Sequence, residues 1–139
     1  MASPRITVAE FEATCGDDRV ELIDGVVVQM PAGSVGSARI STKTGYLLGT
    51  HVFPRKLGQF LAPGCGFVLF PNRATVLAPD GAFLRAGREP QGEALDHFVD
   101  GPPDLAIEVL APADRAEDMA DKVAMYQEAG VPLIWLVDR

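Results

Sequence analysis

The chain has 139 residues, of which 47% are hydrophobic and 22% are charged; this composition excludes disordered and collagen-like classes and predicts one globular domain over residues 1–139. Its formal net charge of −7 argues against a protein that coats nucleic acid by charge alone, so an enzyme acting on nucleic acid would need a local basic patch or bridging metal ions. No apolar run has the length of a signal peptide core or a membrane span, and the two cysteines are isolated, so we expect a cytoplasmic protein with reduced thiols and no membrane contact.

The first predicted elements are a short helix and a hairpin. Thr7 followed three residues later by Glu10 is a capping-box pattern, which predicts a helix over residues 8–14. Two runs rich in β-branched residues then flank Asp24-Gly25, a dipeptide that favours a tight hairpin turn.

The next segment, residues 32–61, is weakly patterned. Its apolar residues between Ile40 and Phe53 could line one face of a helix, but four glycines and Pro54 weaken that pattern. We therefore predict no firm boundaries in this segment.

Extended segments become clearer from residue 67 onward. Residues 67–70 and 74–80 are short apolar runs separated by Pro71-Asn72, which predicts a second hairpin. Residues 81–85 continue as a strand, and residues 86–101 read as a polar loop with one helical turn.

The last third of the chain predicts a strand, a helix and a strand. Residues 104–110 form the first strand, and a capping-box pattern at Asp114 and Glu117 opens a helix of about four turns that ends at Gly130. Residues 133–137 are an unbroken apolar run of the length of a buried strand. Such a unit pairs its strands in parallel, so the fold class is α/β, or mixed α+β, with an antiparallel meander attached.

Glu108 is the residue in this unit that most needs explanation, because it lies in the middle of an apolar strand. An unpaired buried carboxylate costs several kcal/mol or takes up a proton. Strand alternation places Asp104 and Glu108 on the face with the smaller side chains, although Asp104 after two prolines is better explained as a strand-entry residue. Asp80, at the end of its own strand, can converge with Glu108 if the two strands are neighbours, and two close carboxylates usually share a proton or a divalent cation.

Lys122 is the third candidate, because it flanks the buried stripe of the helix and its long stem could carry the ammonium back to the sheet. Two acids and a lysine at one sheet edge are what magnesium-dependent phosphodiester hydrolysis requires. Simpler interpretations stay open: Lys122 could pair with Asp118 on the helix surface, and Asp80 could be a turn residue. Tyr126 and Trp135 are most simply core residues.

Four blocks of the sequence resemble the Uma-two family of endonucleases, a branch of the PD-(D/E)XK restriction-endonuclease-like superfamily. In chain order the blocks are ELIDGVVVQMP, APDGAF, PPDLAIEVLAP and DKVAMYQEAGVPLIWLVD. The resemblance covers about residues 7 to 138. It implies a restriction-endonuclease-like core, with a central mixed β-sheet flanked by helices.

By this resemblance Asp80 matches the aspartate of the PD motif and Glu108 matches the second acid, and both would bind Mg²⁺ or Mn²⁺. Lys122 matches a lysine displaced from the strand onto the following helix, and Glu21 is similar to a recurring N-terminal glutamate that would be a further metal ligand. Members commonly run on beyond the final strand, so an edge element is expected to be missing after Arg139.

The leading hypothesis is a metal-dependent DNA endonuclease, with a homodimer favoured because cutting both strands usually needs two sites. One alternative is a catalytically silent scaffold for oligomerisation or partner binding, which departures from the family at Ser37, Gly81 and Ala111 would favour. Another is a hydrolase of small phosphoesters. Basic residues in residues 39–56 and at Arg73, Arg85 and Arg88 either follow a phosphate backbone or are simply solvated.

Overall fold

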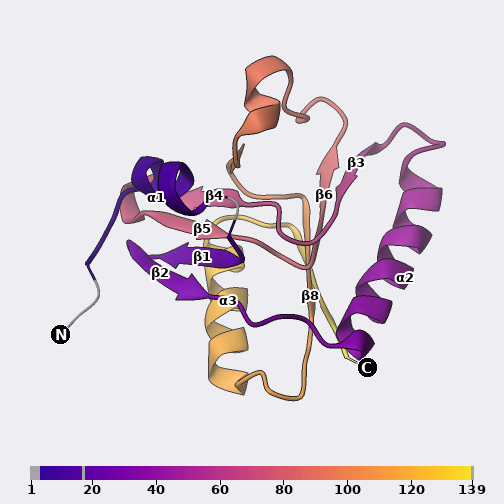
Figure 1. Ribbon diagram of the computed structural model, residues 1–139. Coiled ribbons are helices and arrows are strands. Elements are labelled where there is room, and N and C mark those ends of the chain that lie inside the picture. Colours follow the sequence, from indigo (N-terminus) through magenta and orange to yellow (C-terminus); the bar gives the residue numbers. More distant parts are fainter. Residues whose placement is uncertain (1–3, 17, 139) are drawn as a thin grey trace.

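The computed structural model describes residues 4–16 and 18–138 and shows the predicted α/β architecture, with two mixed β-sheets rather than one central sheet. One sheet has five strands in the order β2-β1-β5-β4-β7, and the other has four in the order β3-β6-β8-β9. The helices α1 and α2 lie at opposite ends of the molecule, with α3 between them (Figure 1). No helix in the described residues is long and apolar enough to cross a membrane. The element bounds are α1 Val8–Cys15, β1 Val20–Ile23, β2 Val26–Gln29, α2 Val35–Val52, β3 Gly58–Leu61, β4 Phe67–Phe70, η1 Pro71–Arg73, β5 Thr75–Leu77, β6 Gly81–Arg85, η2 Gly92–Asp96, β7 Val99–Asp100, β8 Leu105–Val109, α3 Ala116–Glu128 and β9 Leu133–Val137.

Local turn and cap chemistry explains the elements that the sequence predicted well. The Thr7 side chain accepts a hydrogen bond from the Glu10 backbone N–H, which caps α1 as the capping-box pattern requires. Asp24 and Gly25 both have positive φ, 49° and 79°, so the tight turn between β1 and β2 forms as predicted.

Helix α2 is one continuous helix of 18 residues in the weakly patterned segment. Its glycines do not break it, and one of them makes a tertiary contact: the Phe60 ring of β3 packs on Gly45, where a Cβ would lie 3.2 Å from the ring. The Ser34 side chain caps its first turn by accepting from the Ser37 backbone N–H.

The unit of β8, α3 and β9 is parallel as predicted, with Leu105 paired to Leu133 and Val109 paired to Val137. The capping box at its helix start was wrong: Arg115 is the N-cap and makes no side-chain cap bond. The Asp114 carboxylate instead accepts from the Ala111 backbone N–H at 2.7 Å and closes the preceding turn.

Strand β9 is not the buried strand that its apolar run predicted. Within the described residues it pairs only with β8 and forms the edge of the four-stranded sheet. Leu133, Trp135 and Leu136 are 49%, 38% and 47% exposed, so the interpretation of Trp135 as a core residue was also wrong.

The chain crosses from one sheet to the other between β5 and β6. These strands follow one another in the sequence, but β5 lies inside the five-stranded sheet and β6 lies inside the four-stranded sheet. The crossing residues Ala78 and Pro79 are buried, so the two sheets share one core, which includes Phe67, Leu84 and Tyr126. The candidate acids gather at this crossing.

Candidate active site

Three of the four candidate residues make direct contact. The Lys122 ammonium nitrogen Nζ lies 3.1 Å from Oε1 of Glu21 and 3.1 Å from Oε1 of Glu108. The three side chains come from α3, β1 and β8 and are 15%, 5% and 4% exposed. The structure therefore places Lys122 in the interior against the sheets, and not in the surface pair with Asp118 that the alternative interpretation would require.

Glu108 is stabilised in its apolar strand by two donors. The Tyr126 hydroxyl donates to Oε1 of Glu108 at 2.7 Å, and the Lys122 ammonium contacts the same oxygen. Tyr126 is fully buried, as expected of a core residue, but the sequence interpretation missed its hydrogen bond. Its spacing of four residues from Lys122 on one helix was the available signal, because side chains four apart lie on the same face.

Asp80 lies beside Glu108 through strand pairing. Strands β6 and β8 are antiparallel, and Gly81, which follows Asp80, pairs with Ile107, which precedes Glu108. The Asp80 backbone N–H donates to the Ile107 carbonyl at 2.8 Å, and the Val109 N–H donates to Asp80 Oδ2 at 2.7 Å, so the carboxylate is held on β8.

Glu21 connects the site to the crossing between the sheets. Its Oε2 accepts a hydrogen bond from the Ala78 backbone N–H at 2.7 Å, while Oε1 faces Lys122. Both oxygens are therefore already engaged, which distinguishes Glu21 from the other two acids.

The charges in this cluster do not balance, because it contains three carboxyl groups and one ammonium, which contacts two of them. Burial raises the pKa of Glu108 to about 7; Lys122 and the Tyr126 hydroxyl oppose that shift, and Asp80 and Glu21 add to it. Burial alone would lower the pKa of Lys122, but Glu108 and Glu21 outweigh it and the net shift is upward. Near neutral pH the cluster therefore holds a charged lysine and a Glu108 that is partly protonated.

Two carboxylate oxygens remain available for a further partner. Oε2 of Glu108 and Oδ1 of Asp80 have no hydrogen-bond partner within the described residues. Since no fully buried side-chain oxygen in that part of the chain lacks a partner, both atoms are reached by solvent. Two solvent-accessible carboxylate oxygens on adjacent strands, with excess negative charge, suit a hard divalent cation.

The three acids do not form a ready-made metal site by themselves. Across residues 4–16 and 18–138, no group of three or more His, Cys, Asp or Glu side chains is arranged to hold a metal ion. The fit is therefore to two carboxylates, Asp80 and Glu108, with water completing the coordination of an ion such as Mg²⁺, which usually keeps several waters. Glu21 serves as the counter-ion of Lys122 in this arrangement.

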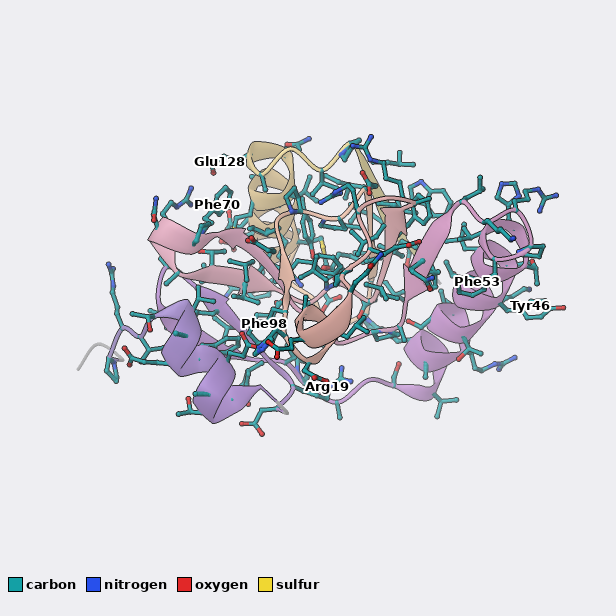
Figure 2. All side chains as sticks on the ribbon, turned by 90° about the horizontal axis from the view of Figure 1, so that it is seen from above. Arg19, Tyr46, Phe53, Phe70, Phe98 and Glu128 are labelled. Carbon is teal, nitrogen blue, oxygen red and sulfur yellow. The ribbon has the colours of Figure 1, made fainter. Side chains whose placement is uncertain are left out.

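A pocket of about 170 Å³ opens beside Asp80 and Ala78. Arg19 and Asp18 also line it, and Figure 2 shows the Arg19 side chain at the surface. Within the described residues the Arg19 guanidinium has no carboxylate partner. It can therefore bind an anionic group of a ligand in the pocket beside Asp80. A second pocket of about 470 Å³, lined by Glu12 and His97 among others, contains none of the candidate residues.

Asp104 has the structural role that its position predicted. Its Oδ2 accepts from the Arg85 backbone N–H and from the Arg88 guanidinium, both at 2.9 Å. These bonds fasten the entry of β8 to the end of β6.

Comparisons with known proteins identify the family and the fold of the chain. A family model described as Uma2, putative restriction endonuclease, matches residues 8–139. The crystal structure of a putative nuclease of the DUF820 family from Anabaena variabilis superposes with a TM-score of 0.79 at 19% identity, over 96% of this chain and 74% of that one, which shows a shared fold. A search of curated protein sequences found no match. With nearly its whole length matched, the chain belongs to the Uma2 family of putative restriction endonucleases.

Proposed function

We propose that this protein is a divalent-metal-dependent DNA endonuclease that hydrolyses phosphodiester bonds at the cluster of Asp80, Glu108 and Lys122. Membership of the Uma2 family supports a nuclease function. The observation that carries the proposal is the ion pair of Lys122 with Glu108 near Asp80, where each of the two acids keeps one carboxylate oxygen without a protein partner in the described residues.

Hydrolysis adds water across a P–O bond, so the site must hold the phosphate, orient a water and neutralise developing negative charge. Asp80 and Glu108 would hold Mg²⁺ or Mn²⁺, which when bound would supply that neutralisation and lower the pKa of a water. Lys122 directs two of its three N–H donors at Glu21 and Glu108 and keeps one for the attacking water.

Two further residues prepare the site in this proposal. Tyr126 holds the Glu108 side chain in place through its hydroxyl, whose pKa is raised well above its ordinary value by burial and then by Glu108, so it stays protonated and donates. Arg19 lies in the pocket beside Asp80 and would hold a phosphate oxygen of the substrate.

A plasmid-nicking assay with Mg²⁺ or Mn²⁺ tests the proposal. The wild-type protein should convert supercoiled to open-circular DNA, and Glu108→Gln and Asp80→Asn should each lower the rate at least about 100-fold, since each removes a ligand of the required ion. Asp118→Asn, an exposed change on the same helix as Lys122, is the matched control and should be silent. Absence of nicking by the wild type over a broad range of conditions, or undiminished nicking by Glu108→Gln, would reject the proposal.

One observation favours the alternative of a silent scaffold. Lys122 already compensates Glu21 and Glu108, so the cluster could serve only to stabilise the fold. Titration calorimetry separates the two functions. A scaffold should bind Mn²⁺ no better than its Asp80→Asn/Glu108→Gln variant, whereas an endonuclease should lose measurable binding in that variant.

A further inference from the structure

The positive and negative charges of this chain occupy different parts of the sequence. Residues 25–79 contain five Lys and Arg and not one Asp or Glu, a net charge of +5. The remaining residues contain seven Lys and Arg and all nineteen acids, a net charge of −12. The overall value of −7 therefore conceals a basic segment of 55 residues.

The fold concentrates this positive charge on α2 and the turn that follows it. Four of the five cations of the segment lie there, and all four are exposed: Arg39, Lys43, Arg55 and Lys56. The Arg55 guanidinium donates to the His51 carbonyl, but within the described residues none of the four has an ion pair with a carboxylate.

Most other cations of the protein are already paired. Arg73, Arg85, Arg88, Arg115 and Lys122 each contact a carboxylate, and in the described part of the chain Arg5 and Arg19 are the remaining cations without one. Four of the six cations without a carboxylate partner in the described residues therefore lie on α2 or in the turn after it.

Two of the four cations, Arg39 and Lys43, lie on the outer side of α2 beside groups that suit a nucleic-acid backbone. Arg39, Lys43, Tyr46 and Thr50 follow one another at helical spacing and are exposed, whereas Val52 on the inner side is buried. Tyr46 is 69% exposed and points away from the molecule (Figure 2).

We propose that the outer face of α2, with Arg55 and Lys56 in the following turn, is a docking surface for the phosphate backbone of duplex DNA. This inference rests on the proposed function, whose substrate class it takes as the ligand, and it names a contact surface on the other side of the sheet from the candidate site. The outer face spans roughly 27 Å along the helix axis, enough for about four phosphate contacts from the four cations.

A second copy of the chain is a less suitable occupant. A twofold dimer would place one basic α2 against another, which like charges oppose. A contact between α2 and the acidic surface of α3, which exposes Glu117, Asp118, Asp121 and Glu128, would be head-to-tail and would not close by twofold symmetry. A phosphate backbone supplies continuous negative charge without either difficulty.

The packing of α2 on β3 and β8 shows how this surface lies relative to the candidate site. Helix α2 packs against both strands, and the Phe60 ring lies between Gly45 of α2 and Gly81 of β6. Gly81 directly follows Asp80, so a single aromatic ring separates the helix from the strand that begins at the site. Helix α2 and Phe60 therefore cover the face of the sheet that Gly81 and Ile107 share, whereas Glu108 points to the opposite face, toward α3 (Figure 1). The outer face of α2 is thus a contact area distinct from the hydrolytic site.

Fluorescence anisotropy with a labelled 30-base-pair duplex tests the docking surface. EDTA keeps the duplex intact, and KCl is varied from 50 to 200 mM. Each phosphate contact contributes about 0.9 to the slope of log Kobs against log salt concentration. Arg39→Gln/Lys43→Gln should therefore make the slope shallower by about 2, and the variant with all four cations changed should make it shallower by about 3 to 4 and weaken binding at 50 mM KCl at least tenfold.

The control is Arg5→Gln/Arg115→Gln. It removes two positive charges, as Arg39→Gln/Lys43→Gln does, but from exposed positions away from α2, and it should leave the slope unchanged. An unchanged slope in the four-cation variant, an equal effect of the control, or a wild type without salt-dependent binding would overturn the inference. A change in sedimentation of the DNA-free four-cation variant relative to wild type would also overturn it, because the surface would then hold a second copy. Plasmid nicking is measured separately, so a protein that binds through α2 but never nicks would refute the proposed function and leave the docking surface standing.

Discussion

Glu108 and Lys122 show how a single chain satisfies a charge in its interior. Two donors reach one oxygen of Glu108, and the ammonium that supplies one of them is shared with Glu21 from another sheet. Removing one partner of a buried pair usually costs more than the pair contributes, because the other charge stays behind without compensation.

Lys122→Met should therefore lower the free energy of unfolding by about 3 kcal/mol at pH 8. The loss should be smaller at pH 5, where Glu108, with a pKa of about 7, already holds a proton and needs no counter-ion. Urea denaturation in EDTA at both pH values measures this difference. Adding Glu21→Gln to the variant should restore part of the stability, and an equal loss at both pH values would contradict the expectation.

Glu108→Gln should have the opposite effect on the pH dependence. The pKa of Glu108 is raised from 4.5 to about 7 on folding, so between these values the folded state binds the proton more tightly and stability falls as pH rises. The stability of the glutamine variant relative to wild type should thus grow by up to about 3 kcal/mol between pH 5 and pH 8 in metal-free buffer. Urea midpoints at intervals of one pH unit would measure it, and Glu117→Gln, an exposed change on α3, should show no such trend.

The backbone of strand β3 lies very close to the backbone of β6 at its first residue, Gly58. Gly58 has a φ of 149° and pairs with Arg85 of β6. A Cβ atom there would lie 1.9 Å from the Leu84 carbonyl oxygen, so no side chain fits without moving one of the two strands. The strand that anchors α2 to the sheet is therefore specified by a glycine.

Gly58→Ala should lower the free energy of unfolding by about 2 to 4 kcal/mol, through backbone strain and the clash with β6. Gly33→Ala is the matched control, because nothing lies within 4 Å of a Cβ at that position. Thermal unfolding of the two variants compares them directly. Equal melting temperatures would show that β3 can shift away from β6 at little cost.

Elements that local chemistry specifies were the predictable ones. The capping box at Thr7 and the turn at Asp24-Gly25 act over a few residues, so the sequence contains the whole signal. The bounds of α2 depend on Phe60 packing against Gly45, and the exposure of β9 depends on its having a single neighbour. Those facts belong to the tertiary structure and leave no local pattern.

The sequence predicted which residues belong to the candidate site, but it did not predict which of them contact one another. The cost of burying Glu108 pointed to a partner, and strand pairing put Asp80 beside it. The ion pair between Lys122 of α3 and Glu21 of β1 joins residues about 100 positions apart, and the family resemblance implied one central sheet where the fold has two. The roles of these residues in metal binding and hydrolysis stay predictions.

At the scale of the whole molecule, the site joins the two sheets, so an ion bound there should stabilise the entire fold. A ligand at 100 times its Kd adds about 2.7 kcal/mol to the free energy of unfolding. Mn²⁺ in the millimolar range should therefore raise the melting temperature by several degrees relative to EDTA. The variant Asp80→Asn/Glu108→Gln should show no rise, and an identical rise in that variant would place the ion elsewhere.

Trp135 gives the free edge of β9 an optical reporter of its own. It is the chain's only tryptophan, it is 38% exposed, and its partner across the strand pair is Ile107, the neighbour of Glu108. Indole emission moves to shorter wavelength when water leaves the ring. Binding of any segment or molecule over this edge should therefore shift the intrinsic fluorescence of Trp135 to shorter wavelength, and no added label is needed to detect it.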